Sequence, residues 1–362
     1  MKKVHANWLP LVLMLLLAAC QAPQQQVQKI STVAADNSAP EDQPLVLTET
    51  IPLRGIVGRF DHFGEGAGKL FVSALGDNHA LVINTGGRVL EQSLPVQDPQ
   101  GETYSPDSKE LFVASGKDGV HVFKGSPFKE IAVVPFEDGA DDLRYDAVKK
   151  RVYVGHGDER TGGLAGIDAM TNKVVEDYKL GAEPENFQVE ASGPNIYVNV
   201  PDLGEISVIN RNTKAIGHWK LNGIASNFPM AMDEPSHRIF IGTHDPPRMA
   251  VFDTTSGKMV AALPGVIDTD DIFFDAALKR IYMPGGAGYI YVYQMKDPDH
   301  YQLLAKIPTT VGAKTAGFWG RQGKGFDRFY LAVPARGNES AEIRIYTVES
   351  ASSAPGDLDS GR

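Results

Sequence analysis

The sequence predicts an all-β protein, a seven-bladed β-propeller, and three observations carry this prediction. A short run of aromatic and β-branched residues returns seven times, at intervals of 41 to 48 residues. Further short apolar runs follow each return, separated by turns rich in Asp, Asn, Gly and Pro. No run of helical period competes with this pattern between residues 45 and 349. A period of about 40–45 residues with several short strands per unit is typical of a propeller blade.

The repeated apolar triad is the second strand of each predicted blade. The seven triads are LFV at 70–72, LFV at 111–113, VYV at 152–154, IYV at 196–198, IFI at 239–241, IYM at 281–283 and FYL at 329–331. A polar segment and a turn precede each triad, giving an inner first strand, and runs such as "LAGIDA" supply a third. Aromatic and β-branched residues suit a pleated, buried strand. Each unit therefore predicts one four-stranded sheet.

The last blade lacks a fourth strand of its own. Six units end in a fourth strand, but the seventh stops after "AEIRIYTVE". The segment "LVLTETIPL", residues 45–53, has the right character to replace it. If this N-terminal strand closes the last blade, no sheet edge stays open. We therefore expect residues 45–349 to form one propeller domain.

Residues 1–20 have the features of an export signal. Lys2 and Lys3 precede the apolar run "WLPLVLMLLLAA", which is too short to span a membrane, and "LAAC" ends at Cys20. This ending resembles a bacterial lipobox, which predicts lipidation of Cys20, the only cysteine of the chain. Gln21 then favours the outer membrane of the cell envelope, contacted through the lipid alone. Residues 21–44 are predicted to be a flexible tether, and residues 350–362 a disordered tail.

The blade pattern resembles one bacterial family. The phrases "RFDHF", "DDLRYD", "PENFQVE", "IYVNVPD", "NFPMAMDE", "DDIFFD" and "AEIRIY" are similar to those of YVTN-repeat, YncE-like β-propellers, over essentially all of residues 45–349. The resemblance implies the fold and an exported protein, but no single reaction, because propellers host many unrelated functions. Some members are thought to bind nucleic acid or partner proteins. The net charge of −10 argues against broad nucleic-acid binding here.

The paired acids of "DDLRYD" and "DDIFFD" stand at the start of inner strands, which line the channel of a propeller. One polar residue per blade is predicted to face the same channel mouth: His62, Gln100, Asp142, Glu185, Asn227, Asp271 and Lys314. Loops between second and third strands add His156, Asp158, His244, Asp245 and Arg336 to this face. The aspartates have three interpretations: caps of turns and blade junctions, ligands of a hard cation, or acceptors in a recognition ring for a polar molecule or peptide.

Two classes of function follow from this mouth. The favoured prediction is a non-enzymatic binding or scaffold propeller without a cofactor, taking a small polar ligand or an envelope protein. The alternative is a calcium- or magnesium-dependent hydrolase or lactonase, by analogy with regucalcin-type gluconolactonases, with Glu185, Asn227 and Asp271 as metal ligands. Lys314 favours the first prediction, because its ammonium group neutralises a carboxylate without a metal.

Motifs of other chemistries are absent or incomplete. "GEGAGKL", residues 64–70, is too short for a phosphate loop and falls where the other blades have a turn, which predicts a hairpin. The chain has no HExxH for zinc, no CxxCH for haem and no GxSxG nucleophile elbow.

Overall fold

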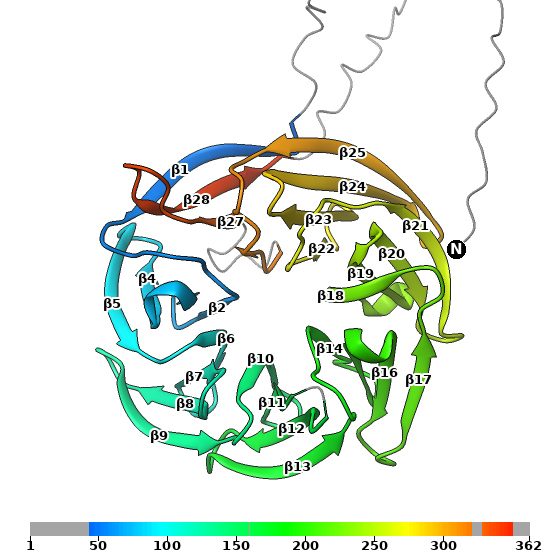
Figure 1. Ribbon diagram of the computed structural model, residues 1–362, viewed down its shortest axis with the longest axis horizontal. Coiled ribbons are helices and arrows are strands. Elements are labelled where there is room, and N and C mark those ends of the chain that lie inside the picture. The colour runs from blue at the N-terminus through cyan, green and yellow to red at the C-terminus, as the bar shows by residue number, and fades with distance from the viewer. Residues whose placement is uncertain (1–42, 159, 321–327, 350–362) are drawn as a thin grey trace, which may run out of the picture. The chain divides into compact units, whose positions relative to one another are not determined.

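The computed structural model describes residues 43–158, 160–320 and 328–349, and these residues form seven four-stranded antiparallel sheets around a central axis (Figure 1). The predicted seven-bladed propeller is confirmed. Within these ranges the only helical elements are three short 3-10 turns, and no helix is long and apolar enough to cross a membrane. The predictions for residues 1–20, for the tether up to residue 42 and for the tail at 350–362 fall outside the described residues.

The first six blades follow the chain in order, and each sheet is numbered from the channel outwards. Blades 1 and 2 are β2 (Phe63–Gly66), β3 (Lys69–Ala74), β4 (His79–Asn84) and β5 (Val89–Pro95), then β6 (Pro99–Ser105), β7 (Glu110–Ser115), β8 (Gly119–Lys124) and β9 (Lys129–Pro135). Blades 3 and 4 are β10 (Ala140–Asp146), β11 (Arg151–His156), β12 (Gly163–Asp168) and β13 (Lys173–Lys179), then β14 (Phe187–Val189), β15 (Asn195–Val200), β16 (Glu205–Asn210) and β17 (Ile216–Lys220). Blades 5 and 6 are β18 (Ala225–Asp233), β19 (Arg238–Asp245), β20 (Pro247–Asp253) and β21 (Lys258–Pro264), then β22 (Phe273–Asp275), β23 (Arg280–Gly285), β24 (Tyr289–Asp297) and β25 (His300–Pro308).

Blade 7 joins the two ends of the domain. It contains β26 (Ala316–Gly317), β27 (Arg328–Val333) and β28 (Ala341–Val348), and its outer strand is β1 (Leu45–Leu53). β1 runs antiparallel to β28, with Leu53 opposite Ala341 and Leu45 opposite Val348. Leu53 is fully buried in the core between blades 7 and 1. The predicted closure by the N-terminal strand is therefore confirmed.

The hydrophobic core lies between neighbouring blades. The triads form the second strands, and their tyrosines, such as Tyr153, Tyr197 and Tyr282, are at most 2% exposed. Tyr153 of blade 3 packs with Phe187 and Ile196 of blade 4, which shows how one sheet covers the next. Burial of large apolar side chains on each sheet face thus stacks the blades around the channel.

The segment "GEGAGKL" is the hairpin that the sequence predicts. Gly66 pairs with Lys69, and the turn between them places Ala67 at φ 51° and Gly68 at φ 73°. Two successive positive φ angles are what a tight two-residue hairpin requires. The segment therefore connects β2 to β3 as a two-residue hairpin turn.

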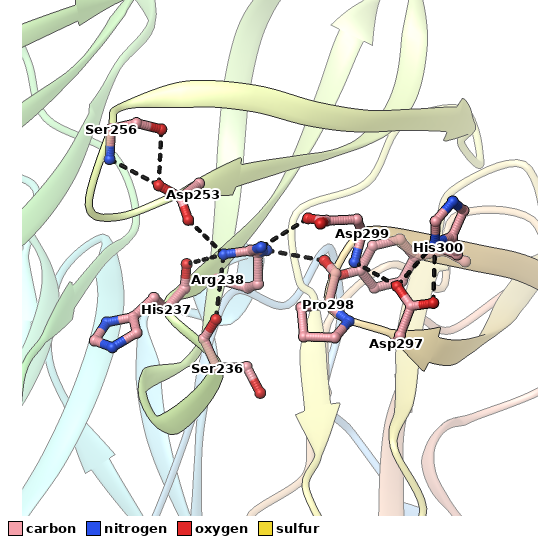
Figure 2. Close-up of polar contacts among 10 residues, drawn as sticks. Ser236, His237, Arg238, Asp253, Ser256, Asp297, Pro298, Asp299 and His300 are labelled. Atoms are coloured by element: carbon pink, nitrogen blue, oxygen red, sulfur yellow. Dashed lines mark hydrogen bonds and ion pairs between the residues drawn. The ribbon is translucent and has the colours of Figure 1, made fainter.

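A buried arginine, Arg238, links blades 5 and 6 (Figure 2). It begins β19, so it lies at the opposite end of this strand from the loop between the second and third strands, and thus on the face opposite the predicted mouth. Arg238 donates to Asp253 of its own blade at 2.6 Å and to Asp299 of the β24–β25 turn, also at 2.6 Å. Its Nε donates to the carbonyl oxygen of Pro298 at 2.8 Å. Because a guanidinium offers five fixed donors, one side chain holds two neighbouring blades in register.

Candidate functional site

Strand pairing identifies residues that lie at the same level of the channel. In blade 3 the inner-strand residue opposite the first triad residue, Val152, is Tyr145, and the equivalent pairs in blades 5 and 6 are Met232–Ile239 and Phe274–Ile281. In each blade, the residue four positions before this inner-strand residue belongs to a set that we call the upper ring. Its members are Asp61, Gln100, Asp141, Glu185, Phe228, Asp270 and Lys314. All seven line one cavity of about 310 Å³, the upper cavity.

A second ring, the waist, lies one residue further along each inner strand. It places His62 between two carboxylates of other blades: His62 Nδ1 is 3.3 Å from Asp271 Oδ1, and His62 Nε2 is 3.9 Å from Asp142 Oδ1. His62 and Asn186 line both the upper cavity and a lower cavity of about 450 Å³. The waist therefore separates two chambers of one channel.

The structure places the predicted mouth residues at several levels. Gln100, Glu185 and Lys314 belong to the upper ring. His62, Asp142 and Asp271 belong to the waist, one level deeper, so that the carboxylates that reach the upper cavity are those of their neighbours Asp61, Asp141 and Asp270. These three neighbours and Phe228 were missed by sequence reasoning.

Asn227 and Arg336 lie away from both chambers. Asn227 is fully buried between blades 4 and 5, where its amide nitrogen donates to Asn199 Oδ1 at 2.7 Å and to the carbonyl oxygen of Glu205 at 3.1 Å. Arg336 pairs with Glu339 at 2.6 Å within the β27–β28 loop. Of the other loop residues predicted for this face, His244 lines the upper cavity.

β-Bulges explain why the depth of each inner-strand side chain in the channel could not be predicted by counting residues along the sequence. The register between inner and second strand shifts between Pro99 and Glu102 in blade 2, between Ala140 and Leu143 in blade 3, and between Asn227 and Met230 in blade 5. A bulge puts two residues opposite one and breaks the alternation of side chains. The sequence did contain one signal of a bulge, a pair of adjacent polar residues such as Asp141 and Asp142. A regular strand with alternating side chains would place only one polar residue there.

The paired acids thus have two different positions. The first aspartate of each pair, Asp141 or Asp270, lines the upper cavity, and the second, Asp142 or Asp271, faces His62. Asp271 also accepts the backbone N–H of Ala316 from blade 7 at 2.7 Å, which agrees with the expected role at a blade junction. The turns themselves are capped by a later aspartate, since Asp146 accepts the N–H groups of residues 148 and 149.

Burial dominates the electrostatics of the upper ring. Burial raises the pKa of Asp61 to about 6 and that of Glu185 to about 8, and Glu183 adds to the effect on Glu185. Burial and the charge of Glu185 hold the pKa of Asp141 well above its usual range. These three carboxyl groups therefore favour the protonated form more than exposed carboxyls do.

The waist is electrostatically different. Burial lowers the pKa of His62, but the charge of Asp142 and the hydrogen bond with Asp271 outweigh burial and hold it well above the usual value. The pKa of Asp142 is lowered despite its burial, because Arg144 donates to it at 2.9 Å and His62 lies beside it. This arrangement therefore favours a protonated His62 imidazole beside an ionised Asp142 carboxylate.

The three residues predicted as metal ligands line no common cavity. Glu185 lines the upper cavity, Asp271 the lower one, and Asn227 neither. Elsewhere at the mouth, His244, Asp268 and Asp270 present ligand atoms within 4.8 Å of one another. Lys314 Nζ lies 2.8 Å from a carboxylate oxygen of both Asp268 and Asp270, so an ammonium group already neutralises this pair.

Comparison with known proteins supports the fold alone. No family model matches the chain, and no curated protein has a significantly similar sequence. Among solved structures, the chain resembles hydrazine synthase from Kuenenia stuttgartiensis, with a TM-score of 0.66 and 16% identity over 77% of this chain and 94% of that one. It also resembles a chain of a mitotic checkpoint complex, with a TM-score of 0.70 and 14% identity over 90% of this chain and 100% of that one. A third similar structure is that of the WD40 repeats of RRP9, with a TM-score of 0.69 and 11% identity over 85% of this chain and 99% of that one. The protein is therefore a seven-bladed β-propeller, a scaffold that hosts many unrelated functions, protein binding among them.

Proposed function

We propose that the protein is a non-enzymatic binding propeller that takes a small polar ligand into the upper cavity. The observation that carries the proposal is the convergence of one residue from each of seven blades on a single chamber of about 310 Å³. A concave site of this size with converging polar groups is the usual form of a small-molecule site. Phe228 is the one apolar member of the ring and offers a surface for the carbon skeleton of such a ligand.

Binding suits the arrangement better than catalysis, because the waist groups already hold one another. Asp142 accepts from Arg144, and Asp271 is engaged by His62 and by the N–H of Ala316. Lys314 is likewise held by Asp268 and Asp270. Groups fixed in this way position a ligand through charge and hydrogen bonding, and they form a rigid floor.

The proposal extends to the cell envelope. The segment "LAAC" supports lipidation of Cys20, and the blade phrases support membership of the YVTN-repeat, YncE-like propellers. The domain then lies on a lipid anchor, with about 24 residues of tether before β1. The variant Cys20→Ser is expected to leave the membrane fraction for a soluble exported form, whereas retention in membranes would contradict the anchor.

The binding function is tested by a thermal-shift screen of small polar compounds against the full chain. Compounds that raise the melting temperature of the wild type are expected to lose this effect with Glu185→Gln, which changes the cavity wall but keeps its shape. The control is Asp297→Asn, which removes a carboxyl group at the β24–β25 turn, on the same face as Arg238 and outside the upper cavity. Stabilisation that persists in Glu185→Gln but is lost in Asp297→Asn would place the site on the other face and overturn the proposal.

A further inference from the structure

We propose that the propeller docks on anionic lipid headgroups with the face opposite the upper cavity, an inference that rests on the proposed lipid anchor at Cys20. This lower face consists of the turns between the first and second strands and between the third and fourth strands of each blade. Docking in this orientation leaves the upper cavity open to its ligand. The unpaired charges of the two faces and the point at which the chain enters the domain support the proposal.

Five exposed lysines, which we call the lysine rim, lie at the edge of the lower face. Each of blades 2 to 6 has one member at or beside the turn between its third and fourth strands: Lys129, Lys173, Lys214, Lys258 and Lys296. None of the five forms an ion pair within the described part of the chain. The rim thus presents ammonium groups that an anionic surface can attract.

The carboxylates directly opposite two of these lysines in the strand ladder already have other partners. Asp168 lies opposite Lys173, but it forms its ion pair with Arg151 at 2.7 Å. In blade 5, Arg238 holds the aspartate opposite Lys258 at 2.6 Å. Because these arginines neutralise the neighbouring carboxylates, the two rim lysines are available to an external anion.

Lysines on the upper face of the same blades are paired. Lys179 ends β13 at the upper face, and its ammonium group lies 2.7 Å from a carboxylate oxygen of Asp177. Lys220 ends β17 at the same face and lies 2.6 Å from a carboxylate oxygen of Glu205. Blades 3 and 4 therefore each carry one paired lysine on the upper face and one unpaired rim lysine on the lower face.

Unpaired acids show the opposite distribution. In the loops of the upper face, exposed acids without an ion pair in the described ranges outnumber the exposed bases Arg54 and Arg59; these acids are Glu137, Asp138, Asp202 and Asp245. In the turns of the lower face, Glu349 is the only such acid among the described residues. An anionic surface therefore attracts the lower face and repels the upper one.

The chain enters the domain on the lower face. Leu45, the first residue of β1, lies opposite Val348, the last residue of β28. β28 is the third strand of blade 7, and third strands run from the upper loops to the lower turns. A flexible chain as long as residues 21–44 spans about 27 Å. A lipid at Cys20 therefore brings the lower face, rather than the mouth, to the membrane.

The lysine rim adds to the lipid and does not replace it. The sequence predicts membrane contact through the lipid alone, and the rim supplies a second, weaker contact. Each lysine near an anionic surface strengthens membrane partition about fivefold, and salt screens this attraction beyond about 10 Å at 0.1 M. The rim thus orients the domain while the lipid holds it, and Cys20→Ser still leaves the membrane fraction.

Co-sedimentation of the unlipidated Cys20→Ser chain with lipid vesicles tests the docking without the anchor. Partition into vesicles of equal parts phosphatidylglycerol and phosphatidylcholine should exceed partition into pure phosphatidylcholine vesicles by about tenfold or more at low salt, and should fall as salt rises. The same loss, about tenfold or more, is expected on neutralising three rim lysines: Lys173→Gln, Lys214→Gln and Lys258→Gln. The matched control changes partition less than about twofold, because it neutralises three paired lysines of the upper face: Lys117→Gln, Lys179→Gln and Lys220→Gln.

The orientation is tested in the lipidated chain, where Cys20 carries the lipid and an introduced cysteine is the only free thiol. Thr213→Cys places a dye at the lower face of blade 4, and Leu203→Cys places it at the upper face of the same blade. Energy transfer from the dye to labelled headgroups should be stronger for Thr213→Cys. Equal transfer from both positions would contradict the orientation.

Three results of the vesicle experiment would overturn the proposal: no partition into anionic vesicles, equal partition into anionic and neutral vesicles, or a loss caused by the upper-face variant in place of the lower-face variant. Self-association that the lower-face variant abolishes, without vesicle partition, would assign this face to a second copy of the chain. Failure of the anchor is a separate result. If Cys20→Ser does not change the location of the protein but vesicle partition depends on the rim lysines, only the anchor is wrong. Unchanged melting temperatures of both triple variants exclude unfolding as the cause of a loss.

Discussion

His62 Nδ1 lies 3.3 Å from Asp271 Oδ1, although 209 residues separate them in the sequence. The contact crosses the channel between blade 1 and blade 6, and Asp142 of blade 3 approaches the other ring nitrogen at 3.9 Å. Three blades thus meet in one charged contact. It forms only when the ring of blades is complete, which connects closure of the fold to the geometry of the cavity floor.

Loss of the imidazole is expected to destabilise the domain. His62→Gln removes the positive charge between two buried carboxylates, and a hydrogen bond to a charged group contributes about 1.5–3 kcal/mol. Urea unfolding at pH 7 should show a loss of this size. His300→Gln is the control, because this histidine side chain is 77% exposed and should change stability by less than about 0.5 kcal/mol. Equal effects of the two substitutions would contradict the waist contact.

Closure by the N-terminal strand predicts unequal roles for two residues of β1. Leu53 is fully buried against blade 1, so Leu53→Ala should cost about 2–5 kcal/mol in the free energy of unfolding. Val46 on the same strand is 38% exposed, and Val46→Ala should cost little. Deletion of residues 45–53 should leave β28 as an open edge and cause aggregation. A deletion variant as stable and monomeric as the wild type would show that closure is dispensable.

The raised pKa of Glu185 predicts a falling stability with rising pH. Below its ordinary value of 4.5 the carboxyl is protonated in both the folded and the unfolded chain. Between 4.5 and about 8 only the unfolded chain loses the proton, so this group lowers the free energy of unfolding by up to about 1.4 kcal/mol per pH unit. Above pH 8 the loss is complete.

Glu185→Gln removes this titration. The variant should match the wild type in thermal or urea unfolding near pH 4.5 and exceed it in stability above pH 8. A stability difference that is independent of pH between 4.5 and 8 would show that the carboxyl titrates normally in the folded protein.

Calcium and magnesium are expected to give no saturable thermal shift beyond ionic-strength controls. Glu185, Asn227 and Asp271 line no common cavity, and Lys314 neutralises the carboxylates beside His244. A folded-state site at a hundred times its Kd would add about 2.7 kcal/mol to stability, which is readily measured. A saturable shift that disappears in Asp271→Ala or Asp270→Asn would favour the metal-dependent hydrolase or lactonase instead.

The sequence predicts the fold better than the site, for a physical reason. Repeated triads such as VYV at 152–154 occupy equivalent buried strands, and a repeat of one sheet leaves few alternative architectures. The seventh repeat lacks a fourth strand, and this absence indicated that residues 45–53, which form β1, complete blade 7. The inner strands, in contrast, contain bulges, and a shift of one residue exchanges Asp141 for Asp142. Side-chain level in the channel depends on these local irregularities, which periodicity does not reveal.

The central claim is that the upper cavity, and not the lower one, is the binding site. It is tested most directly by measuring the calorimetric Kd of the strongest small-molecule ligand for two variants. Asp141→Asn changes the upper cavity and a neighbouring pocket of about 150 Å³ that Asp141 also lines, whereas Thr103→Val changes the lower cavity. We predict that Asp141→Asn raises the Kd at least tenfold and that Thr103→Val leaves it within twofold of the wild type. The reverse pattern, with Kd raised by Thr103→Val and unchanged by Asp141→Asn, would contradict the account.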